Sequence, residues 1–393
     1  MQKSILNQLL FHFLNEIIFV ALFNTMTNEK LKYAIALSRV AGVGDVLAKN
    51  LISYCSGVEN VFAKNKSQLL KVPGIGPIIA DAIVNYKDFT SDEKEVEFIN
   101  KNKIQHVFYT NENYPVGLKQ VPDSPVLLFQ KGELNLNEGR FISIVGTRNA
   151  TDYGKEWTAK FIEEIAPYHP IIVSGLAYGI DIAAHRAALK HGLKTIAVLA
   201  HGLDTIYPGT HRSNAEKIVD QGCLLTEFST ADEFRKDNFP ERNRIVAGLC
   251  EATIVVESAI KGGALITAEI ASSYNKDVFA VPGRTGDQYS AGCNFLIKQN
   301  KAALIESAAE FVEIMNWQND EKKLAPIKQR QLFPDLDPNE QLAVNLIQQR
   351  ETIHVDELML QLKLSSSQFA AAVLGLELKG VIKVMPGKMY KLN

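Results

Sequence analysis

Short apolar runs alternate with mixed polar and apolar stretches through the middle of the chain. Apolar runs bounded by turn residues predict buried strands, and the stretches between them predict helices. We expect strands at residues 141–145, 171–174, 195–199, 223–228, 253–257 and 278–281, and helices at 157–165, 182–190, 214–220, 243–250 and 265–274. The alternation predicts an α/β fold with a doubly wound parallel sheet, and we place this domain at residues 111–318.

A helical domain is predicted before the sheet, over residues 26–110. The pattern hydrophobic–x–Gly–hydrophobic–Gly occurs at residues 40–44 and again at 72–76, each time before an apolar helix. This resembles the helix–hairpin–helix motif, in which glycines let the backbone approach a phosphate. The alternative is a tight turn that uses glycine for its geometry alone. Few lysines flank the hairpins, and both interpretations stay open.

Prolines and charged residues at 319–338 predict a linker, followed by a small domain over 339–393. Three helical patterns and a hairpin at 381–384 and 389–392 are typical of a winged helix, a fold associated with DNA binding. Its predicted recognition helix, 366–379, carries only Lys379 as a cation. A reader of the major groove presents Arg, Lys, Asn or Gln, so we expect mainly protein contacts here.

Residues 1–25 form an apolar extension. Polar residues, among them Asn7, His12 and Glu16, make it a poor membrane span, and it lacks a clear cleavage site. We expect a start-site extension before Met26 rather than an anchor, with the choice between Met1 and Met26 left open.

Composition limits the function classes. The 393 residues carry a formal net charge of −2, so a nucleic-acid site must be a local basic patch. The four cysteines form no C-x-x-C pair, which favours reduced thiols in a cytoplasmic protein. The eight histidines show no metal-ligand spacing, so we expect no metal.

Glycines and an arginine follow the first two strands of the predicted parallel sheet. The strand ends carry Gly146, Thr147 and Arg148 and then Ser174, Gly175 and Gly179. Ligands bind at such strand ends, and bare N–H groups with arginine suit a phosphate. The chain lacks G-x-G-x-x-G with a ribose-binding acid and lacks a G-K-[ST] loop, so we expect no bound dinucleotide, ATP or other cofactor.

Two features of the sequence suggest an enzyme. Asp181 and His185 lie one helical turn apart and can touch, which with Ser174 would suggest a hydrolase. Ser174 lacks the G-x-S-x-G elbow, however. We therefore expect Asp181 to orient His185 and cap the loop, and we expect no catalytic residue. The loop from Gly262 to Glu269 partly matches that of lysine-decarboxylase-like nucleoside-monophosphate hydrolases, which makes such a hydrolase the alternative function.

The segment 235–244 interleaves cations with aromatic residues. Lys236, Arg242 and Arg244 stand beside Phe239 and Asn243. Such a pattern suits single-stranded nucleic acid, where cations meet phosphates and a ring stacks on a base. The alternative is that the ring packs in the core and the arginines pair with Asp232, Glu233 or Glu241.

Five motifs stand in order along the chain and together resemble the DprA/Smf family of DNA-processing proteins. They are Gly146-Thr147-Arg148, Ser174-Gly175-x-Ala177-x-Gly179-Ile180-Asp181, Gly202-x-Asp204-x-x-Tyr207-Pro208, Phe239-Pro240-x-Arg242-Asn243-Arg244-Ile245 and Val281-Pro282-Gly283. The first departs mildly from the family's usual G-S-R.

The resemblance implies a helical SAM-like domain, an extended Rossmann domain and a winged helix. It also implies a non-enzymatic function: binding and protecting incoming single-stranded DNA in natural transformation and helping to load RecA, as a homodimer. The DNA-binding residues we expect are Gly146, Thr147, Arg148, Ser174, Gly175, Gly179, Lys236, Phe239, Arg242, Asn243 and Arg244.

Overall fold

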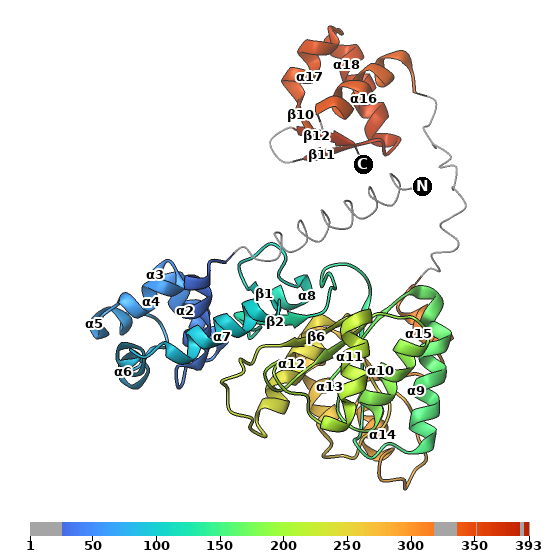
Figure 1. Cartoon of the computed structure of the whole chain (residues 1–393). Helices are drawn as coiled ribbons and strands as arrows, with labels where there is room; N and C mark the ends of the chain where they lie inside the picture. The colour runs from blue at the N-terminus through green and yellow to red at the C-terminus, as the bar shows by residue number, and fades with distance from the viewer. Residues whose placement is uncertain (1–25, 318–335, 351, 386–388, 393) are drawn as a thin grey trace, which may run out of the picture. The chain divides into compact units, whose positions relative to one another are not determined.

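The computed structural model describes residues 26–317, 336–350, 352–385 and 389–392 (Figure 1). The chain divides into two compact units, Met1–Asn319 and Asp320–Asn393, which are described separately. The predicted extension at 1–25 and most of the predicted linker at 319–338 lie outside the described residues. Within the described residues, no helix combines the length and the apolar character needed to cross a membrane.

A nine-stranded sheet forms the centre of the first unit. Its strands are β1 (Gln105–Phe108), β2 (Leu127–Lys131), β3 (Phe141–Val145), β4 (Ile171–Ser174), β5 (Thr195–Val198), β6 (Cys223–Thr226), β7 (Ala252–Val255), β8 (Asp277–Ala280) and β9 (Ala303–Leu304). They lie in the order β1-β2-β6-β5-β4-β3-β7-β8-β9. Strands β3 to β9 are parallel, and β1 and β2 extend the sheet antiparallel beside β6. The predicted α/β fold is confirmed.

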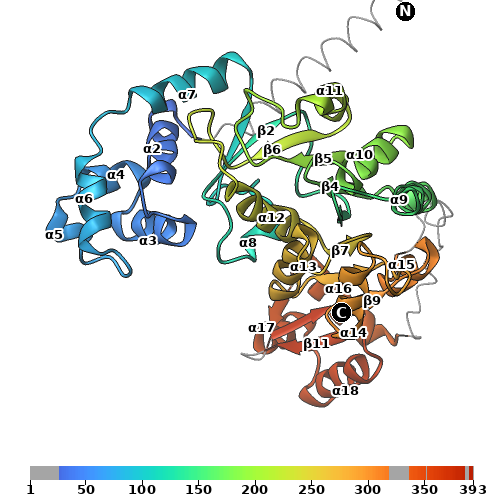
Figure 2. The ribbon, with the colours of Figure 1, turned by 90° about the horizontal axis from the view of Figure 1, so that it is seen from below.

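Helices cover both faces of this sheet (Figure 2). One face carries α9 (Asp152–Ile165), α10 (Ile180–Lys190), α11 (Arg212–Gln221) and α15 (Ala308–Ile314); the other carries α8 (Val116–Lys119), α12 (Asn238–Leu249), α13 (Gly263–Ser273) and α14 (Ala291–Lys298). Successive strand residues point to opposite faces. Ile142 and Ile144 therefore pack with α9 and α10, whereas Phe141 and Val145 pack with α12 and α13. Burial on both sides explains why the strands are apolar throughout.

The strand order reverses direction at β3. From β3 the chain builds β4, β5 and β6 on one side and then returns to place β7 on the other side. The loops that leave the carboxyl ends of β3 and β7 therefore separate, and such a switch point is where open α/β sheets bind ligands.

From residue 26 onward, where the structure describes the chain, six helices precede the sheet: α2 (Asn28–Arg39), α3 (Asp45–Cys55), α4 (Val58–Ala63), α5 (Lys66–Leu69), α6 (Pro77–Asn85) and α7 (Thr90–Lys101). The two glycine hairpins lie before α3 and α6 as expected. Residues 105–108, which the predicted boundary at 110 assigned to the helical domain, form β1 of the sheet instead. The segment is short and begins with two polar residues, so its pattern carried little strand signal.

The second unit is a winged helix. Its elements are α16 (Pro338–Arg350), β10 (Thr352–His354), α17 (Val355–Leu362), α18 (Ser366–Leu378), β11 (Ile382–Met385) and β12 (Met389–Leu392), with the strands in the order β10-β12-β11. Ile347, Leu358 and Leu376 are fully buried at its centre. The predicted hairpin is present, although the tip at 386–387 lies outside the described residues.

Candidate nucleic-acid interface

A cavity of about 280 Å³ opens at the switch point, between the carboxyl ends of β3 and β7. Segments far apart in the sequence meet there. The lining includes Gly146, Thr147 and Arg148 after β3, Phe239 and Asn243 on α12, and Gly262 and Gly263 at the start of α13. The structure thus brings together the strand-end and basic–aromatic segments that the sequence singled out separately.

The backbone N–H groups of the strand-end loops bond within the protein. Thr147 N donates to Glu257 O at 2.7 Å, and Ile180 N donates to Thr147 O at 3.2 Å. Gly175 N and Ala177 N donate to the Asp181 carboxylate at 3.2 and 3.4 Å. The expectation that N–H groups after Gly146, Ser174 and Gly179 hold phosphates therefore needs correction, because these groups already bond to neighbouring loops.

The glycines of these loops are needed for close approach. Gly179 has a φ of +79°, and a Cβ placed there would lie 2.1 Å from Thr147 O. A Cβ on Gly146 would lie 2.4 Å from Ile180 Cγ1. Both positions let the loop after β4 cross directly over the loop after β3. They shape the cavity rather than supply its charge.

Arg148 supplies a free positive charge at the cavity. The side chain is exposed and forms no ion pair among the residues that the structure describes. Its guanidinium carbon lies 5.1 Å from the centre of the Phe239 ring, a cation–π distance. The start of α13 faces the same cavity, with Gly262 as an N-cap that has no side-chain hydrogen bond. A helix N-terminus and a free guanidinium together favour an anion.

Aromatic rings continue from Phe239 onto the surface. Phe239 lies 5.7 Å from the Phe234 ring and 6.1 Å from the Tyr207 ring, centroid to centroid. Phe234 and Tyr207 remain about half exposed, at 49% and 47%. Exposed rings suit base stacking. Tyr207 was missing from the predicted site residues, although the motif that contains it gave a signal. Lys236 is also exposed in this segment, as expected.

Arg242 differs from its expected role as a phosphate ligand. Its side chain is buried, with the residue 5% exposed, and its Nη1 donates to Gly175 O at 2.7 Å and to Val198 O. Its Nε donates to Asn243 Oδ1 at 3.2 Å. Burial lowers the Arg242 pKa to about 10, against the opposing effect of Asp181, so the side chain stays charged at neutral pH. It holds the ends of two strands in place.

Arg244 also turns inward. It donates to Asp45 Oδ2 at 2.9 Å, to the Glu227 carboxylate and to Asp123 O. Burial raises the Glu227 pKa, and the neighbouring Arg244 guanidinium opposes that shift. These partners are not the Asp232, Glu233 or Glu241 considered from the sequence. Arg244 nevertheless forms ion pairs within the protein, as that alternative proposed. Because Asp45 begins α3, Arg244 joins the first glycine hairpin to the sheet domain.

The arrangement offers no hydrolase triad. Ser174 is buried and its hydroxyl donates to Ile144 O at 2.7 Å. Asp181 caps the loop as expected, but His185 Nδ1 lies 2.8 Å from Thr195 Oγ1 instead of bonding to Asp181. Burial lowers the His185 pKa to about 3, so it is neutral. Within the described ranges, no group of three His, Cys, Asp or Glu side chains is placed to hold a metal.

The chain combines a doubly wound sheet that has a cation at its switch point with a glycine-hairpin domain and a winged helix. This combination defines a modular class of nucleic-acid-handling proteins. Family models match accordingly: DNA recombination-mediator protein A at residues 105–316, the DprA winged helix domain at 328–388, and a SAM-like helix-hairpin-helix tandem at 34–85. The chain belongs to the DNA recombination-mediator protein A family, also called DprA/Smf. Members of this family are described as DNA-processing and recombination-mediator proteins.

Relatives support the assignment over nearly the whole length. Protein Smf of Synechocystis is 32% identical over 93% of this chain and 100% of its own length. DNA processing protein DprA of Streptococcus pneumoniae is 42% identical over 50% of this chain and 69% of its own. The solved S. pneumoniae DprA has a TM-score of 0.63 at 33% identity, covering 73% of this chain and 98% of that structure. Helicobacter pylori DprA, studied for its single-stranded DNA binding mode, has a TM-score of 0.50 at 29% identity, covering 55% and 98%.

Proposed function

We propose that this protein binds single-stranded DNA without reading its sequence and acts in DNA processing during transformation and recombination. The observation that carries the proposal is the exposed Arg148, which has no ion-pair partner in the described part of the chain and lies over the Phe239 ring at the switch-point cavity. Family membership and the single-stranded DNA binding of the H. pylori relative support it. The hydrolase alternative has no support from the hydrogen bonds of Ser174 and His185.

In the proposed mode, a phosphate lies between Arg148, Asn243 and the start of α13, where Gly146 and Thr147 keep the cavity open. Lys236 meets a neighbouring phosphate. Bases stack on the exposed Phe234 and Tyr207 rings, each worth about 1–3 kcal/mol. None of these contacts depends on base identity, so binding is sequence-neutral and strongly salt-dependent.

The finer steps are protection of the strand, loading of RecA and assembly as a homodimer. For the homodimer we propose the α13–α14 face, where Ile266 is 42% exposed and Phe295 36% exposed on neighbouring helices. Exposed apolar side chains grouped on one face favour self-association. For the winged helix we propose a protein contact, since Leu374 and Leu378 are exposed on α18 while Lys379 pairs with Glu340.

The test is a salt series of single-strand affinity with Arg148→Ala. Removing one phosphate contact lowers the magnitude of the slope of log affinity against log salt by about 0.7. Raising the salt from 50 to 200 mM then reduces the affinity of the variant about 2.6-fold less than it reduces the affinity of the parent. Lys160→Ala, an exposed cation on α9, is the matched control and leaves the slope unchanged. An Arg148→Ala slope equal to that of the parent would refute the phosphate role. RecA loading is tested separately, by filament growth on single strands coated with a competing binding protein.

A further inference from the structure

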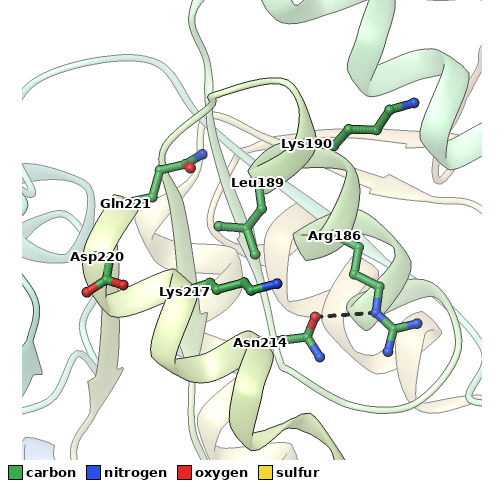
Figure 3. A pocket seen from close by; sticks show the side chains of 7 residues that line it. All are labelled: Arg186, Leu189, Lys190, Asn214, Lys217, Asp220 and Gln221. Atoms are coloured by element: carbon green, nitrogen blue, oxygen red, sulfur yellow. Dashed lines mark hydrogen bonds between the residues drawn. The ribbon is translucent and has the colours of Figure 1, made fainter.

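A second basic feature lies on the opposite end of α10 from the switch-point cavity. A groove of about 560 Å³ separates α10 from α11 (Figure 3). Arg186 and Lys190 line it from α10, and Lys217 lines it from α11. Asp220 is the one acidic side chain among the lining residues, so the groove carries a net charge of about +2 at neutral pH in a chain whose net charge is −2. This concentration of charge needs an explanation.

The three cations of the groove are exposed to solvent. Arg186, Lys190 and Lys217 are exposed and form no ion pair among the described residues. Arg186 is positioned by Asn214, whose Oδ1 accepts from its Nε at 3.4 Å. Figure 3 shows Arg186 and Lys217 extending into the same space between the helices. Like charges converging on one space favour a bound anion.

The groove is joined to the switch-point cavity by α10 itself. Asp181, in the first turn of α10, lines the cavity, whereas Arg186 and Lys190 lie farther along the same helix. At 1.5 Å per residue, these two positions lie about 9 and 15 Å along the axis from the start of the helix. The half-exposed Tyr178 follows Ala177 of the cavity lining, and its hydroxyl accepts a hydrogen bond from Thr210, just before α11. A cation, a ring and further cations in succession fit a strand that lies across the surface.

We propose that the α10–α11 groove is a second contact for the backbone of single-stranded DNA, beyond the phosphate at Arg148. The proposal rests on the proposed function and extends the site from the switch point along one face of the sheet. Arg186 and Lys217 hold phosphates, Lys190 adds charge at the far end, and the half-buried Leu189 lies at the floor against a sugar or base. Single-strand sites on other proteins span about 4–16 nucleotides, a range that allows both contacts on one strand.

The experiment compares a short and a long oligothymidylate, about 5 and 16 nucleotides, in salt series on the full chain. The double variant Arg186→Ala/Lys217→Ala keeps parental binding of the short strand, which needs only the switch point. With the long strand its salt slope falls by about 1.4, and the loss of affinity between 50 and 200 mM salt shrinks about 7-fold. Lys119→Ala/Lys160→Ala, which removes exposed cations on α8 and α9 of the same domain, is the matched control and changes neither slope.

The outcomes separate this proposal from the one it rests on. If Arg148→Ala weakens both strands while the groove variant matches the parent on both, the groove proposal fails and the proposed function stands. If the parent binds neither strand, both fail. If the groove variant instead loses binding of inorganic phosphate with no dependence on strand length, the groove is a small-anion site and the proposed path for DNA is wrong.

Discussion

Replacing Arg242 should destabilise the protein rather than selectively weaken DNA binding. The guanidinium is buried and donates to Gly175 O and Val198 O at the ends of β4 and β5, beside the buried Asp181 carboxylate. Arg242→Ala leaves that carboxylate without its cation and removes a donor from each of the two carbonyls. Removing one partner of a buried pair costs about 3–5 kcal/mol. At about 2–4 °C per kcal/mol, the lower figure corresponds to a fall in Tm of about 6–12 °C.

The assay is thermal unfolding of the sheet domain combined with the single-strand salt series at a temperature where all variants are folded. Arg242→Met/Asp181→Asn is the informative companion, because it removes both charges and should be more stable than Arg242→Met alone. The salt slope should stay parental in every folded variant. An unchanged Tm for Arg242→Ala together with a reduced salt slope would refute this reasoning and would indicate that Arg242 contacts a phosphate of the DNA.

Three further perturbations separate other features of the structure. Gly179→Ala should destabilise the domain and distort the cavity, because its Cβ would clash with Thr147 O. Gly192 has a similar φ of +70° but no neighbour within 4 Å of its Cβ, so Gly192→Ala should cost only backbone strain of about 1–2 kcal/mol. Equal losses of Tm would contradict the clash at Gly179. Burial lowers the His106 pKa to about 4, so the unfolded state takes up a proton first as the pH falls below about 6.5. The free energy of unfolding gained by His106→Leu, measured in urea, should therefore grow by about 2 kcal/mol from pH 7 to 5. A pH-independent gain would show that burial leaves this pKa unshifted. Arg244→Ala should speed hydrogen exchange in α3, which begins at Asp45, without changing the salt slope; unchanged exchange would mean that other contacts hold the helical domain.

The sequence predicted the sheet well because its strands are buried on both faces and therefore appear as continuous apolar runs. Predicted strands at 141–145 and 171–174 coincide with β3 and β4. The pattern failed where burial is not symmetrical or the strand is very short, as at β1 and at the two-residue β9. The family resemblance, carried by loop motifs, was confirmed by the matched models.

The sequence pattern does not predict which partners the Arg242 and Arg244 side chains contact. Arg242 and Arg244 are two residues apart on α12, so at 100° per residue they point about 200° apart around the helix. One therefore reaches the strand ends and the other reaches the helical domain. Asp45, the partner of Arg244, lies 199 residues away along the chain, a separation that no local pattern reports. Arg148 follows a strand end in an exposed loop, and there the simple expectation of a free cation agrees with the structure.

The internal hydrogen bonding of the strand-end loops has a consequence for how members of the family diverge. Because Thr147 N bonds to Glu257 O and Ile180 N to Thr147 O, the shape of the cavity does not depend on the side chain at position 148. If Arg148 binds phosphate as proposed, mutation there can adjust the strength and ionic-strength range of binding without cost to folding. At Arg242, by contrast, replacing the side chain costs stability, so selection keeps this residue for its internal hydrogen bonds and not for a charge at the surface. Two arginines of one site would then evolve under different constraints.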